Sequence, residues 1–101
     1  MTETINEYRE LQSIVSEILA GRAIAFLWGH CPEYDGWERT KRGLARRDEH
    51  LMIRETISVE PAQDDFGVRC SHLTALGDRG ALARSESEAR SWAEGVLAAI
   101  I

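Results

Sequence analysis

The sequence is poor in the residues that mark several specialised classes of protein. Its 101 residues include only two cysteines and two prolines, and no apolar run approaches the ~20 residues needed to cross a bilayer. Two cysteines are too few for a disulfide-dense secreted scaffold. The N-terminus lacks a basic segment ahead of an apolar core, so we expect no signal peptide and a cytoplasmic location.

Catalytic motifs are missing as well. The chain has no Gly-rich phosphate loop, no His-Glu-x-x-His pattern and no Gly-x-Ser-x-Gly pattern. Its length allows one domain, and a domain of this size encloses a large substrate cavity only at a cost in buried surface. We therefore predict a single domain over residues 1–101 that is not an enzyme, with no catalytic residue, no cofactor and no metal site.

Apolar residues at three- and four-residue spacing predict two helices. The first covers residues 4–20, where Thr4 and Glu7 have the spacing of a capping box and Gly21 suits the helix end. Ser85 and Glu88 repeat that spacing before a second helix that runs to the C-terminus. The apolar stripes expected to face the core are Ile5, Tyr8, Leu11, Ile14, Val15, Ile18 and Leu19, and Ala89, Trp92, Ala93, Val96, Leu97 and Ile100.

Between the helices the apolar period shortens to two, which predicts strands. Residues 23–28 are apolar throughout and suit a central strand, whereas the polar and basic residues 37–45 suit a sheet edge. Residues 50–60 and 67–76 complete the set, and residues 77–80 are expected to form the closing turn. The predicted fold class is α+β, with a mainly antiparallel sheet of about four strands and both terminal helices packed on one face, in the order α-β-β-β-β-α.

Two cysteines and two histidines have the chemistry of a zinc site but not its spacing. His30 and Cys31 are adjacent and cannot easily point at one ion, while Cys70 and His72 are two apart on a strand. Buried free thiols, a Cys31–Cys70 disulfide and an activated thiolate are the other interpretations. A small Cys/His zinc-binding or thiol protein is accordingly a second alternative function.

Glu55 is a polar residue on the otherwise apolar face of its predicted strand, between Ile53 and Ile57. Burying a lone carboxylate is costly. We expect either an arginine partner, Arg54 or Arg69, or a bulge that turns Glu55 outward; a catalytic acid is the alternative.

Charge is distributed unevenly along the chain. Residues 38–47 contain five of the twelve basic residues and one of the seventeen acidic residues, so this segment has a net charge of +4 and the remainder −9. We predict that acidic helix faces dock on a basic surface of another protein and that exposed aromatic side chains anchor the contact. The residues expected in this role are Glu7, Glu10, Glu17, Tyr34 and Trp37, with Trp28 as a further anchor.

The alternative function is a nucleic-acid or acidic-partner binder that works through the basic segment. Arg39, Lys41, Arg42, Arg46 and Arg47 would then contact phosphates, while Tyr34 and Trp37 stack a base. The acidic remainder of the chain opposes this interpretation, because it repels a polyanion. A homodimer is compatible with the sequence through the edge strand at residues 37–45 or through the apolar C-terminus.

In size, acidic charge and lack of catalytic motifs, the chain is similar to small phage or mobile-element inhibitors of the anti-CRISPR type. This similarity is one of class, and no motif carries it. It implies an inhibitor or adaptor that occupies the basic surface of a nucleic-acid-binding complex.

Overall fold

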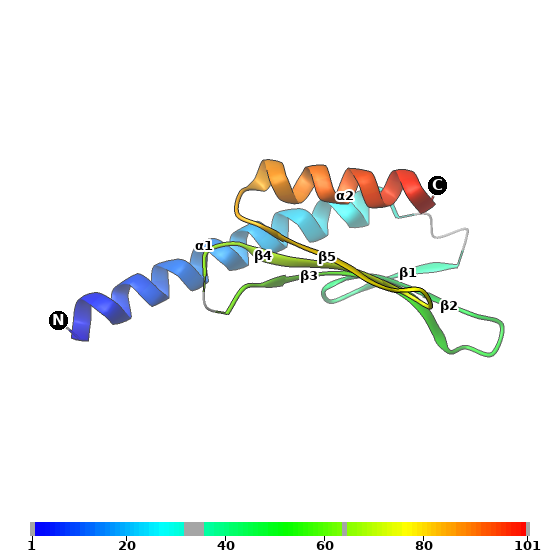
Figure 1. The fold of residues 1–101 in the computed structure, drawn as a ribbon, viewed down its shortest axis with the longest axis horizontal. Helices are drawn as coiled ribbons and strands as arrows, with labels where there is room; N and C mark the ends of the chain where they lie inside the picture. The colour runs from blue at the N-terminus through cyan, green and yellow to red at the C-terminus, as the bar shows by residue number, and fades with distance from the viewer. Residues whose placement is uncertain (1, 32–35, 64, 101) are drawn as a thin grey trace.

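The computed structural model describes residues 2–31, 36–63 and 65–100, with side chains described from Glu7 on. The elements along the chain are α1 (Thr2–Gly29), β1 (Trp37–Thr40), β2 (Gly43–Arg47), β3 (Ile53–Pro61), β4 (Val68–Thr74), β5 (Gly77–Ala83) and α2 (Glu86–Ile100). The strands form one antiparallel sheet in the order β1-β2-β3-β4-β5, and both helices cover the same face of it (Figure 1). The predicted α+β fold is confirmed, with five strands instead of about four.

The first helix is longer than the sequence pattern indicated. Residues 23–28, predicted as a central strand, form the C-terminal part of α1, and Gly21 lies inside the helix instead of ending it. A short run that is apolar on all sides has no period of its own, so its length alone does not distinguish a strand from a buried helix segment. The helix also begins at Thr2, so Thr4 is not its capping residue.

The two halves of α1 are apolar on opposite sides. Leu11, Ile14, Val15 and Ile18 have the spacing i, i+3, i+4, i+7, and the same spacing recurs nine residues later in a second set. Nine residues are about two and a half turns, so the second set faces the other way. This second set packs on the sheet and is buried: Ala20, Ala23, Ile24 and Leu27.

The remaining strands also differ from the prediction in detail. Residues 37–45 form most of a hairpin, β1 and β2, because Gly43 makes a tight return after residues 41–42. A Cβ at Gly43 would collide with the carbonyl oxygen of Ile57, so glycine is required there. Residues 77–80, predicted as a closing turn, begin β5, which pairs with β4 along its whole length.

Polar contacts fix the positions of both helices. Ser16 is fully buried on α1, and its hydroxyl accepts a hydrogen bond of 3.1 Å from the Gly67 amide in the β3–β4 loop. The Trp28 indole N–H donates to the Gly43 carbonyl at 2.9 Å. At α2 the predicted cap is present, since the Ser85 hydroxyl accepts a bond of 3.1 Å from the Glu88 amide.

The opposite orientation of the two halves of α1 predicts a contrast between two identical substitutions. Leu27→Ala removes a fully buried side chain and is expected to lower the free energy of unfolding by about 2–5 kcal/mol. Leu11→Ala alters a side chain that is 54% exposed and is expected to cost less than about 1 kcal/mol. Urea unfolding at micromolar protein concentration measures both values. If both variants lost the same free energy of unfolding, the Leu11 side chain would be as buried as that of Leu27.

Candidate protein-binding surface

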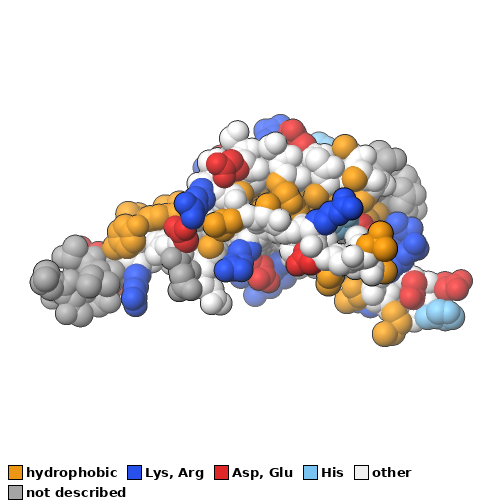
Figure 2. All heavy atoms as spheres, in the orientation of Figure 1, with side chains coloured by type: hydrophobic (Ala, Val, Ile, Leu, Met, Phe, Trp, Pro, Cys, Tyr) orange, Lys and Arg blue, Asp and Glu red, His pale blue; other side chains and the backbone are white. Residues whose placement is uncertain are grey.

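A row of large apolar side chains lies uncovered on α1. Tyr8, Leu11, Ile14 and Ile18 are each at least half exposed, although the sequence pattern predicted that they face the core. The N-terminal part of α1 extends past the end of the sheet, and hydrophobic side chains gather along it (Figures 1 and 2). We call these four residues, together with the partly buried Val15 between them, the α1 stripe. Exposed apolar patches of this kind mark interaction sites in soluble proteins.

One member of the α1 stripe is held in place by the body of the protein. The rings of Tyr8 and Phe66 meet edge to face, with centroids 5.4 Å apart. Phe66 belongs to the same β3–β4 loop that hydrogen-bonds Ser16. The loop therefore supports α1 from one side and leaves Leu11, Ile14 and Ile18 open to solvent.

Carboxylates flank the α1 stripe. Glu7, Glu10 and Glu17 are all exposed. At 3.6 residues per turn, Glu10 and Glu17 lie along one edge of the apolar row, and Glu7 continues the row one turn before Leu11. Within the described residues, Glu7 and Glu10 make no ion pair, whereas Glu17 is 3.7 Å from the Arg42 guanidinium. We call these three residues the acidic edge.

Elsewhere, several carboxylates are paired with arginines at the surface. These pairs involve carboxylates on α2, on β1 and in the β3–β4 loop, and they reduce the acidic charge that those parts of the surface present. The pairs are Arg22–Glu86 at 2.6 Å, Arg90–Glu94 at 3.2 Å, Arg47–Glu38 at 3.1 Å and Arg84–Asp65 at 2.5 Å. In the acidic edge, Glu7 and Glu10 lie beside an apolar surface and have no arginine partner among the described residues, whereas Glu17 is close to Arg42.

The basic segment does not form one patch. Arg39 donates to the Trp28 carbonyl at the end of α1 at 3.0 Å, and Arg42 faces Glu17. Arg47 instead bonds Glu38, on the other face of the hairpin, and also the Leu51 carbonyl at 2.9 Å. Lys41 is exposed in the turn, and Arg46 is half-buried opposite Trp37. Alternation along the strands has divided the five charges between two faces.

The aromatic anchors predicted around this segment are not available as a group. Trp37 is 3% exposed and belongs to the core, so its prediction as a surface anchor is wrong. Trp28 packs against the core and is bound through its indole to Gly43. Tyr34 lies outside the described residues. Trp37 lies on the same face of the β1–β2 hairpin as the buried Leu44, and both belong to the core.

The cysteines and histidines are not brought together. The described residues contain no group of three or more His, Cys, Asp or Glu side chains placed to hold a metal ion, and Cys31 and Cys70 are not joined in a disulfide with each other. Cys70 is buried between sheet and helices, and its burial raises the pKa of its thiol from 9.0 to about 11. His30 bonds the Phe26 carbonyl at 3.0 Å, far along the chain from His72.

The partner of Glu55 is neither of the two arginines expected from the sequence. A ring nitrogen of His72 on β4 lies 2.6 Å from the Glu55 carboxylate, and the two side chains are 13% and 14% exposed. A register shift does occur at Arg46 and Arg47 on the neighbouring strand, but Glu55 still faces the helices. The pair satisfies both polar groups, as a structural contact does.

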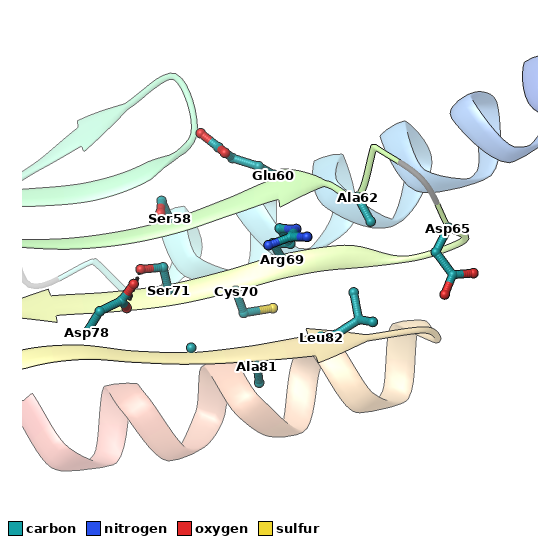
Figure 3. A pocket seen from close by; sticks show the side chains of 11 residues that line it. Ser58, Glu60, Ala62, Asp65, Arg69, Cys70, Ser71, Asp78, Ala81 and Leu82 are labelled. Carbon is teal, nitrogen blue, oxygen red and sulfur yellow. Dashed lines mark hydrogen bonds between the residues drawn. The ribbon is translucent and has the colours of Figure 1, made fainter.

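An open hollow of about 780 Å³ lies on the sheet face away from the helices (Figure 3). Across it, the Ser71 hydroxyl donates to the Asp78 carboxylate at 2.6 Å. A serine nucleophile also needs a general base beside it. His72 follows Ser71 on the strand and points to the opposite face, where it is bound to Glu55. The described residues that line the hollow include no histidine.

By length and composition alone, Glu7–Gly29 within α1 would suffice to cross a membrane, a criterion that core helices and signal sequences also meet. The sequence did not predict so long a helix, because Gly21 was expected to end it. The C-terminal half of the stretch supplies buried residues to the core.

No protein-family model, curated protein or solved structure matches this chain.

The buried position of Cys70 predicts selective thiol chemistry. In the native protein at pH 8, we expect iodoacetamide to leave Cys70 unmodified, because the thiol is shielded and its raised pKa keeps it protonated. In 6 M guanidinium chloride both cysteines should react, as measured by mass spectrometry after proteolysis. Rapid alkylation of Cys70 in the native protein would instead support the alternative function as a thiol protein.

Proposed function

We propose that this protein is a non-enzymatic binding protein whose α1 docks on a basic surface of another protein. One observation carries the proposal: the exposed α1 stripe and the acidic edge lie side by side on the N-terminal part of α1. A helix that presents apolar anchors with charges along one edge suits a partner groove that is apolar at its floor and basic at its rim.

The two parts of the surface have different roles. The carboxylates of the acidic edge steer approach to a positively charged partner and set specificity, an effect that salt weakens. Leu11 and Ile14 supply the desolvated contact from which most of the binding energy comes. Because the sheet and its loop hold α1 through Ser16 and Tyr8, the surface is presented without prior ordering of the helix.

A basic groove of this kind is common on proteins that normally hold nucleic acid. The finer version of the proposal is therefore an inhibitor of a nucleic-acid-binding complex in the cytoplasm, of the phage or anti-CRISPR type, which competes with the polyanion for the groove. The alternative function through the basic segment is less well supported, because three of its five charged side chains are engaged in internal contacts on two faces.

Charge reversal on α1 tests the proposal. Glu10→Lys/Glu17→Lys is expected to reduce capture of the protein partner from nuclease-treated lysate of the native host at least tenfold, because the steering charge is inverted. Quantitative mass spectrometry of the captured proteins measures the change. Folding should persist, since both residues are exposed and the Glu17–Arg42 pair is a surface one.

Glu60→Lys provides the matched control, because Glu60 is exposed on β3, on the sheet face away from the helices, and makes no ion pair among the described residues. This variant should capture the partner normally. If capture survives the α1 reversal but is lost when Arg39, Lys41, Arg42, Arg46 and Arg47 are changed to Gln, the alternative function is the correct one. Capture that nuclease abolishes would identify nucleic acid as the ligand.

A further inference from the structure

The last strand of the sheet has backbone groups without partners. β5 pairs only with β4, over all seven of its residues. The turn between the two strands is closed by Thr74 and Gly77, and a two-residue turn is closed by a hydrogen-bonded pair. Every second residue from Gly77 on therefore bonds β4. The amides and carbonyls of Asp78, Gly80 and Leu82 point away from the sheet, and the described residues give them no backbone partner.

β5 has few of the features that protect natural sheet edges from pairing. It contains no proline, no lysine and no bulge, and its two charged residues, Asp78 and Arg79, both lie near its start. The opposite edge of the sheet is β1, which is only four residues long. β5 is therefore the edge better suited to pairing with another extended chain.

A glycine in the middle of α2 has no role within a single chain. Glycine destabilises the interior of a helix relative to alanine. Gly95 is exposed, and a Cβ added to it would have no neighbour within 4 Å, so the packing of the chain does not require a glycine there. Close approach of a backbone from outside the chain would account for it.

Gly95 lies on the side of α2 that faces the β5 edge. It is one helical turn from Ser91 and one from Ala99, so these three small, exposed residues form a row. Ser91 lines a hollow of about 500 Å³ between α2 and β5. Ala99 lines a second hollow, beside the β4–β5 turn. The row and the unpaired edge therefore belong to one surface.

The distance between the strands and the helix fits a second copy of this chain on that surface. α2 contacts both β4 and β5, so it lies over the space between them. When β5 pairs with β5 of a second copy about a two-fold axis normal to the sheet, both α2 helices lie on the same face. Two strand spacings, about 9–10 Å, then separate the helix axes, which is the distance at which helices pack directly. A lone strand from another protein would leave the row on α2 uncovered.

Charge favours the antiparallel register centred on Gly80. This register pairs all seven residues of β5 and places Arg79 of the partner subunit opposite Ala81. Ala81 and Glu88 line the same hollow, so the partner subunit's Arg79 meets the Glu88 carboxylate. Within the described part of one chain, Arg79 makes no ion pair. A register moved toward the turn would instead place Arg79 or Asp78 opposite itself.

From these observations we infer that two copies of this chain form a two-fold dimer through β5 and α2, which joins their sheets into one antiparallel sheet. α1 contacts β2, β3 and β4, on the side of α2 away from the β5 edge. The dimer therefore leaves the α1 stripe uncovered for its proposed partner. The sequence is compatible with a homodimer through residues 37–45 or the C-terminus; the structure assigns the dimer to the opposite edge of the sheet.

Analytical ultracentrifugation of the purified full chain tests the dimer. We expect a species of twice the 11.4 kDa chain mass. Gly95→Leu should raise the dissociation constant about a hundredfold, because its side chain holds the two α2 helices apart. Gly21→Leu is the matched control and should leave the dimer intact, since Gly21 is an exposed helical glycine on α1 that also has open space around it. Circular dichroism should show native helix content in both variants.

Amide hydrogen exchange followed by NMR tests the strand pairing residue by residue. The Gly80 and Leu82 amides should exchange about a hundredfold more slowly in the dimer than in monomeric Gly95→Leu, because only the second copy supplies them with an acceptor. The Ala81 and Ala83 amides bond β4 and should be protected in both. Protection that alternates in this way identifies pairing at the β5 edge.

A double-mutant cycle tests the register. Arg79→Gln and Glu88→Gln should each raise the dissociation constant about tenfold, because two-fold symmetry uses the ion pair twice. The two changes together should cause no further loss, whereas additive losses would contradict the register. Glutamine keeps an acceptor for the Arg84 amide, which the Glu88 carboxylate binds at 2.9 Å. Arg69→Gln, on the sheet face away from the helices, is the control and should not weaken the dimer.

Three results would overturn the inference. The first is a monomer at millimolar concentration. The second is a dimer that Gly95→Leu leaves unchanged and in which the Gly80 and Leu82 amides are unprotected, which would place the interface elsewhere. The third is a monomer in which these two amides become protected only when another protein is added, which would make a strand of that protein the occupant of the edge.

Discussion

The packing of α1 across the sheet determines how the rest of the molecule is arranged. Ala20, Ala23, Ile24 and Leu27 are buried against β2, β3 and β4, and their small or branched side chains let the helix lie close to the strands. Because a helix is rigid, fixing this C-terminal half also fixes the direction in which the N-terminal half leaves the sheet. The uncovered α1 stripe is a direct result of that geometry.

The same packing brings several carboxylates close to arginines. Arginines from the strands and from both helices lie close to carboxylates on neighbouring elements once the helices are docked. Exposed pairs of this kind add little stability, yet they cancel the local field that a partner would sense. Glu7 and Glu10 escape this neutralisation because the strands do not extend beneath them (Figure 1). The apolar and acidic parts of the candidate surface thus have one common cause, the extension of α1 past the sheet.

The basic segment illustrates how a charge pattern along the chain can mislead. Five positive charges in ten residues suggest one patch, but the segment folds into a hairpin whose successive side chains point to opposite faces. Arg39 is used to bind a carbonyl at the end of α1, where helix carbonyls lack partners, and Arg47 stabilises the β2–β3 loop. These contacts support the fold. They leave few charges in a common plane for a polyanion to contact.

The sequence by itself determined the fold class, the antiparallel sheet and the second helix with its Ser85 cap. It also determined which face of β3 is buried, the face of Ile57 and Val59. Each of these features depends on short-range periodicity or on capping. It also contained both apolar sets of α1, nine residues apart. Only the tertiary structure decided that residues 23–28 continue the helix, that Trp37 is buried and that His72 is the partner of Glu55. It alone decided which apolar set of α1 meets the sheet. Periodicity gives the side of a helix on which apolar residues lie, whereas burial depends on which other elements come to cover that side.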